Sequence, residues 1–429
     1  MRALWWVVLS VGSTVAQAEE GGGAQAAGGA ATDAEAAAPE RASPAPSAAP
    51  VEAPRGRCPE GTLACFEAGS VAAWPRVRLR PAFEAVQADP ELLYVGHNDG
   101  FFFDQARLGL DMALGAHVRM RFILESASAS PGSEPNDPVL NLGTAPRDVF
   151  LTWAPSAWFQ LQAGQLFMPS DLENGDVLGD IAFTRRSVMS QGVRNGHGQA
   201  VSGLSAPRQV GVVVGTGTGA QVGGIPVEAR LGVASGNGLN LQGNDNDLPA
   251  LFLRLGARFS DLVRIGVGGR YNPRTEGSLP NLFQETDAVA FADLTVQAAG
   301  AQLVLSAIGR QTSFDTLLPD AQQDGSSETA YGGAAWLTYR YEAPTLAGLR
   351  GLVFTPALRT SLYEPSSAFQ TDTLLEHTVA LRVDGDRATL PLSFFVDYAI
   401  LTERGDLGGS AKARDLSNNR LTTILQLDL

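Results

Sequence analysis

Lysine is almost missing from this sequence of 429 residues. Lys412 is the only one, so the other basic residues among the 31 Lys and Arg are all arginines. Acidic residues outnumber them, and the formal net charge is −14. An acidic balance argues against nucleic acid as a partner. It leaves open a membrane channel, because charges on loops and charges inside a pore act separately.

Long hydrophobic runs are also missing after the first 18 residues. A transmembrane helix needs about 20 consecutive apolar residues. Residues 1–18 combine Arg2, an apolar run and the small-residue ending Ala16-Gln17-Ala18, which is the pattern of a secretory signal peptide. We therefore expect a mature chain that starts at Glu19 outside the cytoplasm. If this chain crosses a membrane, it does so with strands.

Large apolar side chains are scarce between residues 19 and 57, where Ala, Gly, Pro and Glu dominate. Such a segment cannot bury enough surface to offset the entropy lost on ordering. We predict a disordered periplasmic segment here.

Only two cysteines occur, Cys58 and Cys65, in the stretch R-C-P-E-G-T-L-A-C. In an oxidising compartment two neighbouring cysteines favour a disulfide, and their spacing matches no strong template for a metal pair or a redox motif, which remain alternatives. Residues 58–73 are therefore interpreted as a small disulfide loop and a linker.

Histidine is scarce too, and this bears on enzymatic function. An outer-membrane lipase or protease needs a histidine beside a nucleophile and an orienting acid. None of the four histidines stands in such a pattern: His97, His117, His197 and His377. No cofactor motif is present, and the acidic run at residues 244–247 lacks EF-hand spacing, so calcium is only an alternative there. We expect a protein that is not an enzyme.

What the sequence does contain is alternation, most clearly in its last stretch, L-T-T-I-L-Q-L-D-L at 421–429. Successive side chains of a strand point to opposite faces, so the leucines share one face with Thr423, and Thr422, Ile424, Gln426 and Asp428 share the other. A membrane barrel must pair its last strand with its first to leave no open edge in lipid. A terminal strand of a soluble sandwich is the alternative.

About sixteen alternating segments follow one another from residue 74 to 429, near the length of about 10 residues expected of barrel strands. Short connections such as Gly115-Ala116, Ser260-Asp261 and Ala299-Gly300 alternate with long ones, as between the two rims of an outer-membrane barrel. Long linkers are expected around Asn98, Asn136, Asn195, Asn244, Pro280, Asp324, Pro365 and Gly408. The predicted fold is all-β, a transmembrane antiparallel barrel.

The longest connection, Gln165 to Pro207, carries many apolar residues that would pack poorly in open water. A connection of this length in a compact domain is usually functional. It is the third long loop, and we expect it to fold into the barrel and narrow the pore, with Arg185 and Arg186 in its middle. We expect these two arginines to favour the passage of anions. The alternative is that they only hold the loop to Asp or Glu side chains.

Strand alternation also predicts which charged residues line the pore. We expect an excess of arginine on this face, and a positive potential that low-dielectric walls focus along the channel. The predicted pore-lining residues are Arg76, Arg78, Arg80, Arg107, Asp111, Arg119, Arg121, Glu125, Arg254, Arg258, Arg264 and Arg270.

Several stretches resemble the phosphate-selective porins of Gram-negative bacteria, the porins O and P. They are A-R-L-G-L at 106–110, A-G-Q-L-F-M-P at 163–169, Glu173, F-T-R-R-S at 183–187, L-G-V-A-S-G-N-G at 231–238 and the closing N-N-R-L-T-T-I-L-Q-L-D-L. The resemblance is spread over residues 76–429. It implies a sixteen-stranded barrel, usually trimeric, with an arginine ladder and an inward third loop.

Together these observations predict an outer-membrane porin for passive diffusion of small polar solutes, with a preference for anions such as phosphate or carboxylates. The expected partners are outer-membrane lipids, the barrel-assembly machinery through Leu421–Leu429, small anionic solutes and further copies in a homotrimer. The competing hypothesis is a barrel that anchors the N-terminal segment to the cell wall or to a periplasmic partner.

Overall fold

The computed structural model describes residues 58, 64–90, 95–96, 99–126, 144–175, 181–194, 197–198, 201–237, 248–278, 281–314, 327–343, 351–367, 372–385, 391–405, 414–416 and 418–429. The predicted signal peptide (1–18), the predicted disordered segment (19–57) and the acidic run at 244–247 lie outside these residues. The described residues belong to one compact unit, Ala45–Leu429.

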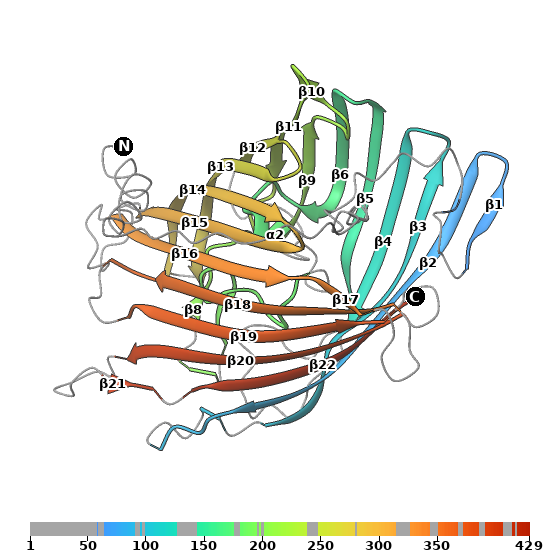
Figure 1. Cartoon of the computed structure of the whole chain (residues 1–429). Coiled ribbons are helices and arrows are strands. Elements are labelled where there is room, and N and C mark those ends of the chain that lie inside the picture. The colour runs from blue at the N-terminus through green and yellow to red at the C-terminus, as the bar shows by residue number, and fades with distance from the viewer. Residues whose placement is uncertain are drawn as a thin grey trace, which may run out of the picture. The chain divides into compact units, whose positions relative to one another are not determined.

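Sixteen antiparallel strands pair in chain order, and the last pairs with the first to close a barrel. The strands are β2 (Val71–Val86), β3 (Gly100–Leu114), β4 (Val118–Ser126), β5 (Thr144–Ser156), β6 (Phe159–Phe167), β9 (Arg208–Gly215), β11 (Ile225–Ala234), β12 (Ala250–Phe259), β13 (Val263–Ser278), β14 (Asn281–Ala298), β15 (Ala301–Phe314), β16 (Ser327–Tyr339), β18 (Leu352–Glu364), β19 (Leu374–Asp384), β20 (Leu392–Gly405) and β22 (Arg420–Asp428). Figure 1 shows β2, in blue, beside β22, in red. The predicted number of strands and the predicted closure are confirmed.

The seam of the barrel lies between the two ends of its chain. Arg78 pairs with Asp428 and Leu79 with Leu427 across it. At its first residues, 71–73, β2 pairs with β1 (Phe66–Ala68). The barrel was predicted to begin at residue 74, but its first strand begins at Val71, because β1 and the start of β2 form a hairpin that extends the strand.

A disulfide joins Cys58 and Cys65 just before β1, with their Cα atoms 6.0 Å apart. Cys58 packs against buried Ala72, Trp74 and Ala113, at the start of β2 and the end of β3.

The remaining elements are short: α2 (Leu172–Gly175), α3 (Val188–Gln191), β7 (Gly192–Val193), β8 (Val201–Ser202), β10 (Gln221–Val222), β17 (Tyr341–Ala343) and β21 (Arg414–Asp415). Within the part of the chain that the structure describes, no helix has the length and apolar character needed to cross a membrane.

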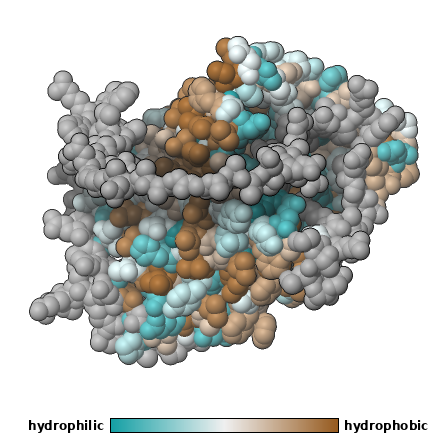
Figure 2. All heavy atoms as spheres, in the orientation of Figure 1, coloured by the Kyte–Doolittle hydropathy of each residue, from teal (hydrophilic) through white to brown (hydrophobic). Residues whose placement is uncertain are grey.

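In many strands the side chains alternate between a more buried and a more exposed face, as β12 shows. Leu251, Leu253 and Leu255 are exposed, whereas Phe252 and Arg254 between them are buried. Because the sheet closes on itself, the buried face is the inner one. Large hydrophobic side chains are spread over the surface in Figure 2, with hydrophilic residues among them. Exposed leucines on the outer face with an arginine on the inner face reverse the arrangement of a soluble protein. They suit a barrel whose outer face meets lipid.

One rim of the barrel carries tight turns, as predicted. Residues 115–117, 260–262 and 299–300 each connect two strands there, and Gly115 supplies the positive φ of +63° that one turn requires. We call this rim the turn end and the opposite rim the loop end. The long connection predicted around Pro280 is wrong, because β13 and β14 continue to Ser278 and Asn281 and form a ribbon of 16 and 18 residues.

Candidate functional site: the barrel interior and the segment after β6

The described part of the chain between β6 and β9 contains α2, α3 and the β7–β8 pair, and several of its side chains contact residues of the barrel strands. Phe183, Val188 and Met189 belong to one hydrophobic cluster with wall residues such as Ile308 and Trp336. The helix α3 packs against β16, β18 and β19. Among the apolar residues of this connection that the structure describes, six are buried: Leu166, Met168, Leu172, Phe183, Val188 and Met189.

An ion pair joins this segment to the first barrel strand. Arg185 Nη2 donates to Glu84 Oε2 at 2.8 Å, and the same carboxylate accepts from Thr422 Oγ1 at 3.0 Å. Burial lowers the pKa of the Arg185 guanidinium, but the charges of Glu84, Asp104 and Asp397 and the hydrogen bond to Glu84 together outweigh burial and raise it. Arg185 is therefore a charged group held by the wall.

His197 binds the other oxygen of the same carboxylate. Its Nε2 lies 2.7 Å from Glu84 Oε1, and its backbone carbonyl accepts from Asn418 Nδ2 at 2.9 Å. Burial lowers the pKa of His197 to about 4, although Glu84 acts in the opposite direction. The ring is therefore neutral near pH 7, and the contact is a hydrogen bond from a neutral imidazole to a carboxylate.

Arg359 of β18 connects the segment to the strands on the other side of the β2–β22 seam from Glu84. Its guanidinium donates to the carbonyl oxygens of Arg185 at 2.8 Å and Arg186 at 3.3 Å. It also lies 2.6 Å from Glu376 and 3.5 Å from Glu173. One wall arginine thus holds the backbone and a carboxylate of the segment together.

Two more buried carboxylates bind this segment, one from the barrel wall and one from the segment itself. Asp397 of β20 accepts from Thr184 N at 2.6 Å and from Thr184 Oγ1 at 2.7 Å. Glu173 of α2 accepts from Ser187 N at 2.6 Å and Ser187 Oγ at 2.5 Å. Burial raises the pKa of the Glu173 carboxyl, and Arg359 and Ser187 oppose that rise.

Arg186 and Arg194 have different surroundings from Arg185. Arg186 donates to Asn174 Oδ1 at 3.1 Å and lies over the Phe167 ring at 5.6 Å. Burial lowers the pKa of the Arg194 guanidinium to about 9. Arg194 was missed in the sequence, because nothing in its neighbourhood marks it as buried.

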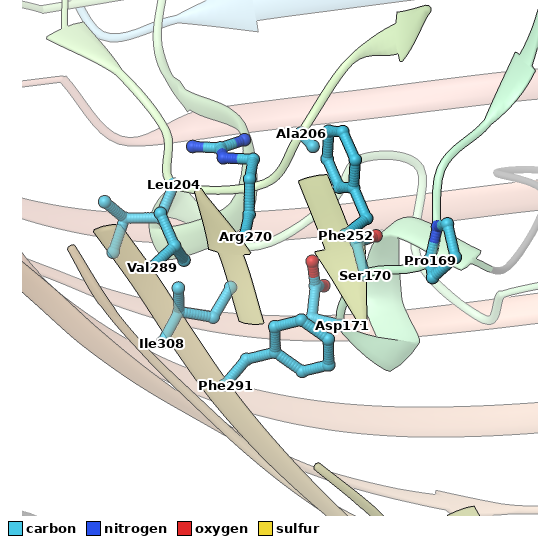
Figure 3. A pocket seen from close by; sticks show the side chains of 10 residues that line it. All are labelled: Pro169, Ser170, Asp171, Leu204, Ala206, Phe252, Arg270, Val289, Phe291 and Ile308. Carbon is cyan, nitrogen blue, oxygen red and sulfur yellow. The ribbon is translucent and has the colours of Figure 1, made fainter. Parts of the chain in front are cut away.

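A cavity of about 10 Å³ separates the segment from β12–β15, with room for one water molecule. Figure 3 shows side chains that line it: Ser170, Asp171 and Leu204 come from the segment, and Arg270 and Phe291 come from the wall. Burial raises the pKa of the Asp171 carboxyl.

The predicted pore-lining residues all occupy the alternate strand positions whose side chains face the barrel interior, but their exposure differs. Arg80, Arg107, Asp111 and Arg254 are buried, and Arg76 is exposed near the turn end. The remaining predicted residues are partly buried: Arg78, Arg119, Arg121, Glu125, Arg258, Arg264 and Arg270. Their role in ion choice stays a prediction.

Most of these charges are paired across strands. Arg107 lies 2.8 Å from Glu125 and Arg78 lies 2.6 Å from Asp428. Arg254 makes two hydrogen bonds with Asp293, at 2.7 and 2.9 Å. Further pairs that sequence reasoning did not assign join Arg208 to Asp148 and Arg230 to Glu228.

No protein-family model matches the sequence, and no curated protein matches it. Solved structures do match its fold. The anion-selective porin from Comamonas acidovorans has a TM-score of 0.51 and 13% identity, over 84% of this chain and 100% of that chain. The outer-membrane channel DcaP of Acinetobacter baumannii has a TM-score of 0.52 and 12% identity, over 86% and 100%. The trimer form of OmpT from Vibrio cholerae has a TM-score of 0.50 and 12% identity, over 84% and 99%.

Proposed function

We propose that this protein is an outer-membrane porin that lets small polar solutes diffuse passively. The observation that carries the proposal is the closed sixteen-stranded barrel with leucines outside and arginine–carboxylate pairs inside. Barrels of sixteen strands leave an aqueous channel, whereas smaller ones are filled by their own side chains. The similar folds of an anion-selective porin and of DcaP add support.

The segment after β6 is the proposed constriction. Its contacts with Glu84 of β2, Arg359 of β18 and Asp397 of β20 come from the inner face of three strands around the seam. On the other side, Arg254 of β12 donates to the carbonyl oxygen of Ser170 at 2.7 Å. Anchors on both sides of the barrel are what a loop folded into the channel requires.

Within this constriction, Arg185 has a structural role in our proposal. The sequence allowed two roles for Arg185 and Arg186: acting directly on passing anions, or holding the loop to acidic side chains. The bond from Arg185 to Glu84 and the bond from Arg359 to its carbonyl favour the second role.

Anion preference, with phosphate and carboxylates as solutes, belongs to the same proposal, as do a homotrimer, surrounding outer-membrane lipid and insertion by the barrel-assembly machinery. Arginine stays charged and offers several donors to an oxyanion. The N-terminal segment would then lie in the periplasm, on the side of the turn end.

Single-channel recording in planar bilayers tests the proposal. Full-length protein should give discrete conductance steps, because a sixteen-stranded barrel leaves an open path. A folded barrel that inserts but never conducts would contradict a porin and favour the anchoring role.

A further inference from the structure

The inner arginines of the barrel differ widely in exposure, and the most exposed ones are the groups that a solute can reach. In contact with the segment after β6, the side chains of Arg80, Arg185 and Arg359 are 0%, 6% and 1% exposed. Between that segment and the turn end the exposure is far higher for four arginines. The side chains of Arg76, Arg121, Arg230 and Arg264 are 53%, 36%, 41% and 34% exposed.

The first exposed group is built on Asp111 of β3. Arg76 Nε lies 2.9 Å from Asp111 Oδ2, and Arg121 donates to both carboxylate oxygens, at 2.8 and 3.0 Å. Asp111 itself is buried, so it fixes two guanidinium groups while their outer edges face the interior. We call Arg76, Asp111 and Arg121 the Asp111 cluster, and its formal charge is positive.

The second exposed group is built on Glu228 of β11. Arg230 Nε lies 2.9 Å from Glu228 Oε1, and Arg264 Nη2 lies 3.3 Å from Glu228 Oε2. Arg254 lies 3.9 Å from the same carboxylate but is itself bound by Asp293. We call Arg230, Glu228 and Arg264 the Glu228 cluster, and it too carries two guanidinium groups on one carboxylate.

The register of the strands places like charges directly opposite each other in this region. Arg230 pairs with Arg254 across β11 and β12, and Arg258 pairs with Arg264 across β12 and β13. Like charges in directly opposed positions destabilise a sheet. Asp293 and Glu228 offset part of this repulsion, and a bound anion would offset more of it.

Each cluster has a member close to a tight turn, and the Glu228 cluster reaches from there to Arg254, which also binds the Ser170 carbonyl oxygen of the segment. Arg121 is three residues beyond the start of β4 at Val118, and Arg264 follows Val263, the first residue of β13. Each guanidinium has five N–H donors, more than one shared carboxylate can accept, so donors remain for a ligand. Their planar geometry matches the two oxygens of a carboxylate or phosphate group.

We infer that the Asp111 and Glu228 clusters bind small oxyanions between the segment after β6 and the turn end of the barrel and set its anion preference, while the buried arginines hold the constriction. This inference rests on the proposed porin function and gives it a location. The ligand class is small carboxylates and inorganic phosphate.

The test uses four Arg→Gln substitutions together, at Arg76, Arg121, Arg230 and Arg264, in the full-length protein. Binding of inorganic phosphate to the detergent-folded protein is measured by calorimetry, and the permeability ratio of chloride to potassium is measured in planar bilayers. We expect at least a severalfold loss in both. The matched control is Arg340→Gln, which removes an equally exposed arginine at the same end from a one-to-one pair with Glu342 at 3.0 Å and should change neither.

A second set with lysine at the same four positions keeps the charge and guards against misfolding of the glutamine set. The lysine variant should fold and retain most of the chloride preference. It should lose part of the phosphate affinity, because lysine lacks the planar guanidinium group with its paired N–H donors. Unchanged phosphate binding and an unchanged permeability ratio in a folded glutamine variant would overturn the inference, as would an equal effect of Arg340→Gln. A wild-type barrel that binds phosphate through these residues without conducting would support the binding site but refute the porin function, and with it the role of the clusters in anion preference.

Discussion

Arg185 Nη2 lies 2.8 Å from Glu84 Oε2, and both side chains are buried where the segment after β6 meets the first barrel strand. The two residues are 101 positions apart in the chain. Their contact means that the arginine most suggestive of a solute-binding group is occupied by the protein itself. Four predictions examine this attachment, the barrel and its N-terminal hairpin.

Arg185→Ala should loosen the segment without moving the ion preference. Removing one partner of a buried pair costs about 3–5 kcal/mol when the other charge is left uncompensated, and the cost here should be smaller because Thr422, His197 and Arg420 remain beside Glu84. Hydrogen exchange should therefore become faster in residues 183–194, and open-channel current noise should rise. Arg186→Ala is the control, because Arg186 binds the uncharged Asn174 and should give a smaller effect. A marked shift toward cation preference in Arg185→Ala alone would restore the direct role of Arg185.

Acidification should weaken the same attachment through His197. Its pKa is about 4 in the folded protein, below the ordinary value of 6.5. When the segment is detached, His197 has its ordinary pKa and takes up a proton at a higher pH than it does when attached. The attached state is therefore fully stabilised above about pH 6.5. Its stability relative to the detached state falls by on the order of 3 kcal/mol as the pH falls to about 4. The frequency of brief channel closures should rise over this range.

His197→Gln keeps a donor toward Glu84 but cannot titrate, so closures should no longer depend on pH in that interval. His117→Gln is the control, since His117 lies in an exposed turn and its ring faces the Ala154 carbonyl oxygen. An identical pH response in His197→Gln and the wild type would show that another group senses acid.

Leu253→Arg should destabilise the barrel in lipid. Leu253 is an exposed residue of β12 between two other exposed leucines, and an arginine on the lipid face near mid-membrane costs about 2–4 kcal/mol. Urea unfolding in lipid vesicles measures the loss, and Leu253→Val should stay close to the wild type. If Leu253→Arg unfolds at the wild-type urea concentration, this face does not meet lipid.

The bridge between Cys58 and Cys65 should matter only locally. Replacing both by serine should speed hydrogen exchange in Phe66–Ala68, because β1 is held by three residue pairs with β2 and by this bridge. Conductance should not change, and deleting residues 19–57 should leave it intact as well. Free thiols in protein purified without reductant would contradict the bridge.

Much of the barrel follows from the sequence, because a strand has a period of two and a closed barrel has only two faces. Arg254 between Leu253 and Leu255 could be placed inside from that pattern alone. The ends of elements were harder: β13 and β14 run past the predicted loop at Pro280, since paired backbone can continue wherever no residue forbids it.

The partners of the charged residues could not be predicted from the pattern. The parity of β2 indicates that Glu84 faces inward, but it carries no information that Arg185 and His197 meet this one carboxylate from a distant segment. The exposure of Arg121 and the burial of Arg80 were equally hidden, because both have inward parity. Such differences depend on how the chain packs inside the barrel, which no local pattern records.

The zero-current potential across a KCl gradient tests the central claim most directly. Full-length protein in a planar bilayer should develop a potential of the sign that chloride permeation produces, and high salt should reduce it, since screening shortens to about 3 Å at 1 M. A potential of the opposite sign, with potassium preferred, would contradict an anion-preferring porin.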